Sequence, residues 1–303
     1  MPELPEVEVV RRGVAQWATG RRVEVTQVHD ERSLRRHVGG TEDFVERLTG
    51  AVLLAPQRRG KFLWLPLEST PGVSASCLAI HLGMSGQVLI NEPGDPRPKH
   101  AKVTLTLVTP GQAAREMRFI DQRIFGGMHL TQLAPSSHPC GSIPATAAHI
   151  APDALEPVLD AEGFYALLRA RRTGIKRALL DQQLISGVGN IYADEALWQA
   201  QLHYARPTET MTRREARRLL EALRVVMDAA LQAGGTSFDA LYVNVNGASG
   251  YFDRSLQCYG QAGRPCSRCE TAGRTTVIRR EPFMGRSAYF CPRCQPRPRR
   301  GRW

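Results

Sequence analysis

Four cysteines near the end of the chain constrain its fold more than any other sequence feature. Cys266 and Cys269 are separated by two residues, and Cys291 and Cys294 repeat that spacing after 21 intervening residues. Two Cys-x2-Cys pairs can each hold one side of a tetrahedral ion, and four thiolates leave no coordination position open. The spacing therefore predicts one structural Zn²⁺. A redox dithiol is the alternative for one pair, but it does not explain both.

The segment between the two pairs contains TTVIRREPFMGRSAYF, which is strand-like in composition. A metal at the cysteines would therefore stabilise a β-hairpin that carries Arg279, Arg280 and Arg286. Cys258 lies outside the pattern and is expected to be packed in a core. The total of seven cysteines is odd, which argues against a disulfide framework.

The positive charge of the chain is concentrated in the same region. The formal net charge is +11, and residues 258–303 contain 11 arginines against only Glu270 and Glu281. Such a patch suits a polyanion, so we expect a nucleic acid as the partner. An anionic membrane is the alternative, but no amphipathic helix of the membrane-surface kind accompanies the arginines. The acidic first residues and the absence of a long apolar run predict a cytoplasmic protein.

The pattern of the sequence changes along its 303 residues, which are enough for two domains. Short β-rich runs from 22 to 130 predict an antiparallel sandwich or barrel. Helical patterns follow, including a long amphipathic helix with a capping-box spacing at Thr212 and Glu215. The predicted fold class is therefore α+β. The expected divisions are a helix and β-sandwich domain over 1–132, a linker over 133–157, a helical domain over 158–252, a metal-binding hairpin over 253–295 and a basic tail over 296–303.

The first residues give Pro2 two interpretations. Apolar residues at helical spacing predict a helix over residues 1–18, and Pro2 can simply begin it, with Glu3 near the positive end of its dipole. Alternatively, removal of Met1 would leave Pro2 with a free secondary amine. With an ordinary pKa of about 8, part of that amine is unprotonated at neutral pH and can attack a sugar carbon. Taken alone, these residues favour the first interpretation.

Two further segments combine glycine turns with residues suited to nucleic acid. In SGVGNIYADEALW, Gly187 and Gly189 permit a tight turn, and Asn190 can cap the following helix, whose first amides are natural phosphate ligands. An ordinary αα-hairpin is the alternative.

In HLGMSG and DQRIFG, the side chains of Met84, Arg123 and Phe125 could fill the gap left by an extruded nucleotide. Taken singly, Met84 and Phe125 would be core residues and Arg123 a member of a surface ion pair.

Together these segments resemble the formamidopyrimidine-DNA glycosylases over essentially the whole chain. The matching segments, in order, are PELPEVE, RRGKF, HLGMSG, DQRIFG, SGVGNIYADEAL, GGTSFDALYVNVNGASGYF and the four-cysteine finger. The resemblance implies a bifunctional DNA glycosylase and AP lyase of base-excision repair. It would remove 8-oxoguanine and formamidopyrimidines opposite cytosine from damaged double-stranded DNA, as a monomer without an obligate protein partner. Residues 236–250 would supply a lesion-capping loop.

The resemblance also implies catalytic roles for four residues. Pro2 would attack C1′ of the damaged nucleotide and become a Schiff base, and Glu3 would act as the acid-base residue that helps to open the sugar. Lys61 would bind phosphate and assist β elimination, and Arg286 would do so for δ elimination.

Other residues are implied to support the site or to bind DNA. Glu6 and Glu195 match carboxylates that support the active site. Met84, Arg123 and Phe125 match a void-filling triad, with Arg123 facing the orphaned cytosine. The remaining implied DNA contacts are His81, His100, Arg171, Asn190, Tyr259 and, near the lesion, Lys176.

Two departures from the family pattern stand out. The 21 residues between Cys269 and Cys291 exceed the usual spacing because of an extra ETAGRTT region, which predicts a longer finger tip. Gln122 and Ile124 also replace residues that are often proline and a base, with little expected loss of function.

Two alternative functions remain open at this stage. Endonuclease VIII-type enzymes remove oxidised pyrimidines with the same proline chemistry, but they begin PEGPE, whereas this chain has Leu4. A catalytically silent DNA-binding paralogue would have no need of Pro2, Glu3 and Lys61 together.

Overall fold

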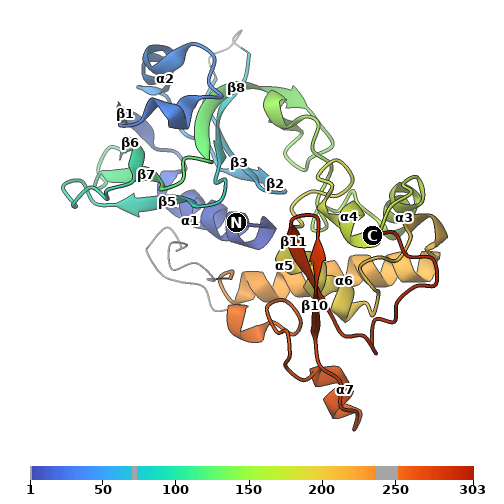
Figure 1. The fold of residues 1–303 in the computed structure, drawn as a ribbon. Helices are drawn as coiled ribbons and strands as arrows, with labels where there is room; N and C mark the ends of the chain where they lie inside the picture. The colour runs from blue at the N-terminus through green and yellow to red at the C-terminus, as the bar shows by residue number, and fades with distance from the viewer. Residues whose placement is uncertain (1, 70–73, 237–251) are drawn as a thin grey trace. The chain divides into compact units, whose positions relative to one another are not determined.

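A computed structural model describes residues 2–69, 74–236 and 252–303, and the chain divides into two compact units (Figure 1). The first unit is formed by Met1–His149 with Ala233–Tyr251, and the second by Ile150–Gln232 with Phe252–Trp303. Within the described residues, no helix is long and apolar enough to cross a membrane. The elements confirm the predicted α+β class, and the segment predicted as a lesion-capping loop lies outside the described residues from 237 onward.

The first unit contains two antiparallel sheets, a four-stranded one of order β1-β6-β7-β5 and a five-stranded one of order β2-β3-β4-β8-β9. Their buried side chains form one core with helix α1 (Leu4–Ala18) and helix α2 (Gly40–Leu48). The strands are β1 (Arg22–Val28), β2 (Gln57–Arg59), β3 (Phe62–Pro66), β4 (Ser76–His81), β5 (Gly86–Asn91), β6 (Ala101–Val108), β7 (Arg115–Asp121), β8 (Gly127–Pro135) and β9 (Ser142–Pro144).

Helix α1 begins with a capping box, in which the side chain of Glu3 accepts from the Glu6 amide and the Glu6 carboxylate accepts from the Glu3 amide at 2.8 Å. Pro5 occupies the first turn, and Pro2 precedes the helix. The interpretation of Pro2 as the residue that begins the helix is therefore wrong. The capping role belongs to Glu3 and the first-turn role to Pro5.

The sequence pattern does not predict α2, nor the strands in the first part of the expected 133–157 linker. Helix α2 is short and buries only Phe44 and Leu48, one turn apart, so its period is hard to detect among strands. Strand β9 is an edge strand next to β8. Proline is tolerated at such an edge, which explains why a proline-rich, loop-like sequence is paired here.

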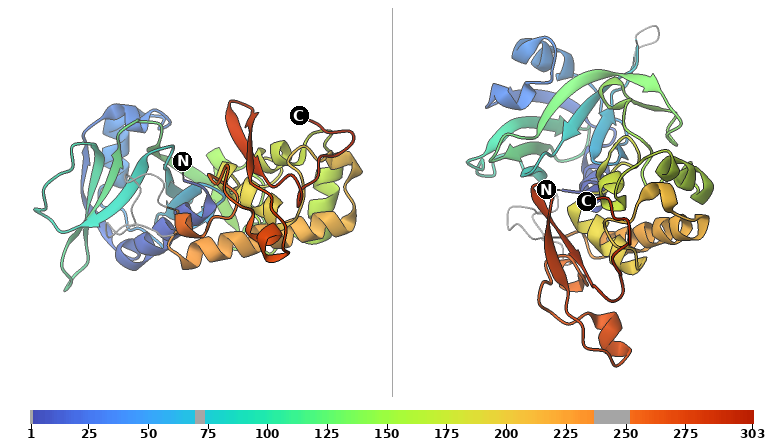
Figure 2. Two further views of the ribbon diagram at one scale, coloured as in Figure 1. Left: turned by 60° about the horizontal axis from the view of Figure 1, so that its bottom comes forward. Right: turned by 45° about the vertical axis from the view of Figure 1, so that its right-hand side comes forward.

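The second unit is mainly helical and ends in a hairpin (Figure 2). The long helix α6 begins with the predicted capping box, in which the Glu215 amide donates to Thr212 Oγ1 at 3.2 Å. Helix α5 packs against α6, and strand β11 packs against α5. The elements are α3 (Ala161–Arg169), α4 (Ile175–Leu180), α5 (Asn190–Gln199), α6 (Arg213–Gln232), α7 (Ser267–Thr271), β10 (Arg279–Phe283) and β11 (Arg286–Phe290), with single 3-10 turns η3 (Thr208–Thr210) and η4 (Phe252–Ser255).

The segment predicted as a solvated basic tail, 296–303, keeps its arginines exposed, but it also contacts the second unit. The Arg302 amide donates to the Ala205 carbonyl at 2.9 Å. The ring of Trp303 lies edge-on to that of Tyr204, with centroids 5.6 Å apart. These contacts come from residues about 100 positions away, which composition does not reveal.

Candidate active site and nucleic-acid interface

The residues next to Pro2 are held by the buried carboxylate of Glu6. One oxygen of Glu6 accepts the Glu3 amide at 2.8 Å. The other accepts the amide and the hydroxyl of Thr236, at 3.0 Å and 2.9 Å. Glu6 therefore connects the start of the chain to the last described residue before the 237–251 segment, within the first unit. Glu3 is also buried, with 2% of its surface exposed.

A second carboxylate, Glu8, attaches α1 to the turn that precedes Lys61. Glu8 accepts from Arg58 of β2 at 3.1 Å, and Arg58 also donates to the Gly60 carbonyl at 3.1 Å. Burial alone would raise the pKa of Glu8, but hydrogen bonds and charge from Arg11 and Arg58 lower it to about 2. The carboxylate is thus ionised at neutral pH. The partly exposed Lys61 follows a turn that is anchored to α1, the helix that directly follows Pro2 and Glu3.

His81 at the end of β4 is prepared to donate a hydrogen bond. Its Nδ1 accepts the Gly83 amide at 3.1 Å, so the neutral ring carries its proton on Nε2. Burial and the nearby charges of Arg36 and Lys61 lower the pKa of His81 to about 4. The imidazole is therefore neutral at pH 7 and can offer Nε2–H to a phosphate oxygen.

The three predicted void-filling side chains are exposed in the first unit. The exposed fraction is 41% for Met84 and 52% for Phe125, and Arg123 is also exposed. Their two turns are in direct contact, because a Cβ added to Gly83 would lie 2.4 Å from the backbone nitrogen of Gly126. The core alternative for Met84 and Phe125 is therefore wrong.

Asp121, which sequence reasoning missed, organises both turns from a fully buried position. One carboxylate oxygen accepts the Ser85 hydroxyl at 2.6 Å and the Arg123 amide at 3.1 Å. The other accepts the Gly126 amide at 2.8 Å. A single carboxylate thus joins the turn of Met84 to the turn of Arg123. The sequence offered one signal for this role, because Asp121 is the first residue of the DQRIFG segment.

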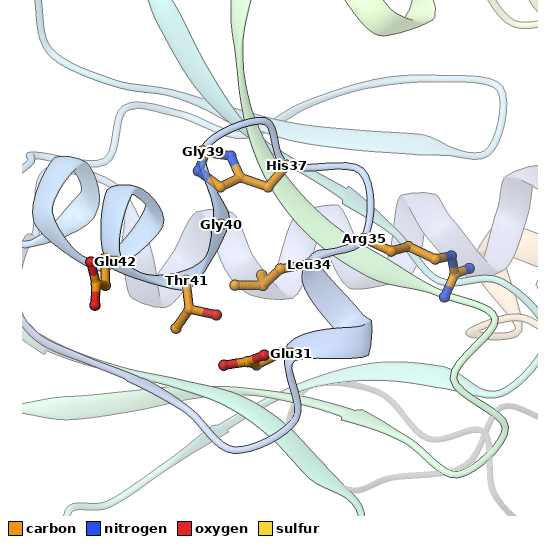
Figure 3. A pocket seen from close by; sticks show the side chains of 8 residues that line it. All are labelled: Glu31, Leu34, Arg35, His37, Gly39, Gly40, Thr41 and Glu42. Carbon is orange, nitrogen blue, oxygen red and sulfur yellow. The ribbon is translucent and has the colours of Figure 1, made fainter.

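The exposed side chain of Arg35 binds the backbone of the same turn, residues 121–126. It donates to the carbonyls of Ile124 and Phe125, both at 2.6 Å, and Ile124 has a positive φ of 56°. Arg35 also borders a shallow pocket, where its side chain points away from His37 and Thr41 (Figure 3). The pocket is also lined by Glu31, Leu34, Gly39, Gly40 and Glu42, which include two carboxylates. No sequence signal pointed to Arg35.

The double turn before α5 has a different cap from the one predicted. The N-cap is Gly189, without a side-chain cap, and Asn190 is the first helical residue. The Asn190 amide side chain instead donates to the Ser287 carbonyl of β11 at 3.1 Å. The helix start therefore remains suited to an anion, while its asparagine binds the hairpin.

Glu195 lies further along α5 and is 3% exposed. Its carboxylate accepts the backbone amides of Gln257, Cys258 and Tyr259 at 3.1, 2.8 and 2.7 Å. Burial raises the pKa of Glu195, although these three bonds counter the shift. Glu195 therefore fixes the chain where it enters the cysteine-rich region. The ring of Tyr259 is partly buried, 5.1 Å from that of Tyr289.

The position of Lys176 differs most from the one predicted, which was an exposed contact with DNA near the lesion. Its side chain is fully buried and forms an ion pair with Asp194 of α5 at 2.7 Å. Its ammonium also donates to the Ser287 carbonyl at 2.8 Å. This burial contradicts a direct DNA contact for Lys176. The sequence hides the partner because Asp194 lies 18 positions away on another helix.

The four cysteines meet as predicted. The sulfurs of Cys266, Cys269, Cys291 and Cys294 all lie within 4.8 Å of one another, a set compatible with a metal ion. Burial opposes ionisation of Cys266, but hydrogen bonds from the Cys269 backbone and the Trp198 indole help to lower its pKa to about 7. One thiolate is therefore accessible near neutral pH, and a bound cation would favour ionisation of the other three.

The extra residues of the finger do not lengthen its tip. They form the end of α7 and the following turn, where the Cys266 amide donates to the Thr276 carbonyl at 2.8 Å. In Figure 1, α7 lies at the opposite end of the hairpin from its turn. That turn has only Met284 and Gly285 between the paired residues Phe283 and Arg286, so the longer-tip prediction is wrong.

The predicted site residues thus form two groups, one in each unit. The first unit presents Pro2, Glu3, Glu6, Lys61, His81, His100, Met84, Arg123 and Phe125. The second presents Arg171, Asn190, Glu195, Tyr259, Arg286 and the cysteines. Arg286 and Arg171 are exposed, Arg171 beside Asp181 at 3.4 Å, and His100 is partly exposed.

Comparison with known families matches both units. Residues 1–128 match the formamidopyrimidine-DNA glycosylase N-terminal domain, and residues 150–241 match the formamidopyrimidine-DNA glycosylase H2TH domain. Among curated proteins, the chain is 54% identical to a formamidopyrimidine-DNA glycosylase of Acidothermus cellulolyticus over 303 residues, covering 100% of both chains. It is 54% identical to that of Streptomyces coelicolor, covering 99% of both.

Solved structures agree with these matches. A complex of Lactococcus lactis Fpg with an abasic-site DNA matches with a TM-score of 0.79 and 28% identity, covering 97% of this chain and 100% of that one. A complex of the wild-type Lactococcus lactis protein with an oxidised-pyrimidine DNA matches with a TM-score of 0.80 and 28% identity, covering 98% and 100%. With both units matched and more than half of the residues shared with full-length relatives, the chain belongs to the formamidopyrimidine-DNA glycosylase family.

Proposed function

We propose that this protein excises oxidised purines, 8-oxoguanine and formamidopyrimidines, from duplex DNA and then cuts the strand as an AP lyase. The observation that carries the proposal is the environment of Pro2. It lies outside α1, directly before a buried glutamate whose backbone is fixed by Glu6. A terminal amine in that place needs no side chain to become a nucleophile.

The reaction begins at C1′ of the damaged nucleotide. The Pro2 nitrogen forms a bond to C1′ and loses its proton, while the glycosidic bond breaks with its electron pair leaving on the base, which takes up a proton. Glu3 gives a proton to the ring oxygen, so the C1′–O4′ bond opens and C1′ becomes the carbon of a Schiff base with Pro2. The iminium then accepts the electrons released when a C2′ proton is lost, and the 3′ phosphate departs by β elimination. A second elimination expels the 5′ phosphate.

The charged residues of the site support these departures. Lys61 offers a cation to the phosphate that leaves by β elimination, and Arg286 does so for δ elimination. His81 binds a phosphate through Nε2–H. Asn190, at the start of α5, and Tyr259 clamp the backbone, with His100 and Arg171 as further contacts. Most of these contacts are with phosphates, as is usual for proteins that bind DNA.

Specificity would come from the exposed loop of the first unit. Met84 and Phe125 fill the space of the extruded nucleotide, and the Arg123 guanidinium faces acceptors of the orphaned cytosine. The four cysteines would hold one structural Zn²⁺, which fixes the hairpin and takes no part in the reaction. We expect a monomer that acts in the cytoplasm on the nucleoid.

Removal of oxidised pyrimidines is the second candidate, because one similar solved structure is a complex with oxidised-pyrimidine DNA. Leu4 in place of the glycine of PEGPE favours the purine lesions. The two candidates share the proline chemistry, so only the substrate distinguishes them.

Borohydride trapping tests the proposal. Purified protein is incubated with a duplex carrying 8-oxoguanine opposite cytosine, and the Pro2→Gly variant and an oxidised-pyrimidine duplex are run alongside. We expect a covalent adduct on the purine duplex, located at residue 2 by mass, and a loss of about 100-fold or more in Pro2→Gly. Trapping mainly on the pyrimidine duplex would support the second candidate. Tight binding without an adduct, after Met1 removal, would indicate a silent DNA-binding protein.

A further inference from the structure

A buried ion pair lies beneath the hairpin that carries Arg286. Lys176 of α4 and Asp194 of α5 are 0% and 1% exposed at their side chains, and their charged atoms are 2.7 Å apart. Two charges removed from water so completely cost free energy unless their remaining hydrogen-bonding groups are satisfied. The hairpin supplies two of the groups that satisfy this pair.

Both partners bind the backbone of β11. The Lys176 ammonium donates to the Ser287 carbonyl at 2.8 Å, and the second oxygen of Asp194 accepts the Tyr289 amide at 3.0 Å. The ammonium also lies 5.0 Å from the ring centroid of Phe283 on β10. The pair therefore contacts both strands, close to the residues that flank the Met284–Gly285 turn.

These contacts add to the packing of Phe283 on Tyr204, whose ring centroids are 5.7 Å apart, and they reach the backbone of β11 directly beside Arg286. Within the part of the chain that the structure describes, β10 and β11 form a two-stranded sheet without a third strand, and an isolated two-stranded hairpin is marginally stable. The four cysteines hold the end away from the turn. At the turn, Asn190 adds one more hydrogen bond to Ser287 at 3.1 Å.

We propose that Lys176 and Asp194 are positioning residues that hold β11 against α5 and so fix the direction of Arg286, the residue next to Ser287. This inference rests on the proposed function, in which Arg286 assists δ elimination. It assigns a purpose to a lysine that cannot touch DNA from its buried place. It also adds Asp194, which binds the hairpin and the lysine with separate oxygens, to the functional set.

The test compares two variants with a matched control. Lys176→Met removes one charge, and the double variant Lys176→Met/Asp194→Asn removes both while it keeps an oxygen for the Tyr289 amide. Arg213→Met, which breaks an exposed ion pair with Glu162 in the same unit, is the control. Three quantities are measured on the full-length protein: the ratio of δ to β products on an abasic-site duplex, amide exchange over residues 286–290, and bound zinc.

We expect the δ to β ratio to fall about tenfold in both variants, because misplacement of a reacting group by about 1 Å is enough for such a loss. Exchange over 286–290 should become faster, while trapping at Pro2 and bound zinc stay close to those of the parent protein. Arg213→Met should change none of these. The Arg286→Ala variant should lower the same ratio, and adding Lys176→Met to it should have no further effect.

Two results would overturn the inference. One is an unchanged δ to β ratio and unchanged exchange in the double variant while Arg286→Ala lowers the ratio. The other is loss of zinc from the double variant, since the pair would then stabilise the finger as a whole. If Arg286→Ala leaves the ratio unchanged, the proposed role of Arg286 fails instead, and the exchange at 286–290 still decides whether the pair positions the strand.

Discussion

The two units carry their candidate site residues on very different supports. In the first, Pro2, Lys61 and the void-filling loop rest on a large apolar core that α1 shares with both sheets. In the second, Arg286 lies on a two-stranded hairpin that ends at a small core consisting largely of cysteines and whose own strands bury Phe283, Ala288 and Phe290. Apolar burial is not directional, so the first support tolerates local change. The hairpin depends on a few directional contacts, and losing one of them should have a larger local effect.

Removal of the metal is the most direct test of this difference between the two units. We expect chelation of the ion that Cys266, Cys269, Cys291 and Cys294 are proposed to hold to lower affinity for lesion DNA by about 100-fold or more, because the free energy of metal binding would also stabilise the hairpin. Amide exchange should become fast over 279–290 and stay slow over the strands of the first unit. Re-addition of zinc is the control. Equal loss of protection in both units would show that their supports do not differ in this way.

Asp121→Ala tests whether the first unit also depends on a directional contact. Asp121 is fully buried and its carboxylate accepts two amides and a hydroxyl. Its removal leaves those donors unsatisfied, which should lower the free energy of unfolding by about 4 kcal/mol. Urea unfolding measures this. Asp95→Ala, an exposed turn aspartate of the same unit, should cost below about 1 kcal/mol, and equal losses would contradict the assignment.

The lowered pKa of Glu8 predicts how the stability of the first unit depends on pH. Its pKa is about 2 in the folded protein, against an ordinary value of 4.5. A lowered pKa stabilises the fold at pH values above 4.5, and that stability is lost as the pH falls from there through about 2. The contribution is about 3 kcal/mol at most. Glu8→Gln should therefore flatten the acid branch of the stability curve. An acid branch that is the same in both proteins would exclude Glu8 as its cause.

Arg35→Met should have the smallest effect. Arg35 is exposed, and its two hydrogen bonds to Ile124 and Phe125 should together contribute about 1 kcal/mol to loop order. Binding of an abasic-site duplex should weaken about fivefold, with trapping at Pro2 unchanged once the duplex is saturating. Arg32→Met, in the 3-10 turn Glu31–Leu34 that directly precedes Arg35 but paired with Asp30, is the control. Equal weakening in both variants would mean that only net charge matters.

Much of the fold could be predicted because its signals are local. The helix after Pro2, the strands from 22 to 28 and 101 to 108, and the capping box of α6 follow from periodicity and spacing within a few residues. The two cysteine pairs also carry their geometry in their spacing. Failures occurred where local composition was misleading, as in the proline-rich stretch that contains β9, and the contacts of the 296–303 segment were not foreseen.

The candidate site also contains features that the local sequence predicts and others that depend on distant parts of the chain. Exposure of Met84, Arg123 and Phe125 agrees with a sequence prediction, because glycine turns place neighbouring side chains at the surface. The role of Arg35 could not be predicted, since it depends on a turn contributed by another part of the chain, and for Asp121 the sequence did not show that it also binds the Ser85 turn.

The sequence by itself determined the order of helices and strands, the metal-binding spacing and the proline that begins the proposed chemistry. Only the tertiary structure decided what the charged residues face. Glu6 meets Thr236 across 230 positions, and Lys176 turns inward to Asp194 rather than outward. Spacing along the chain sets local geometry, but the environment of a charge is set by the groups that folding brings near it, and one sequence does not show which distant groups those are.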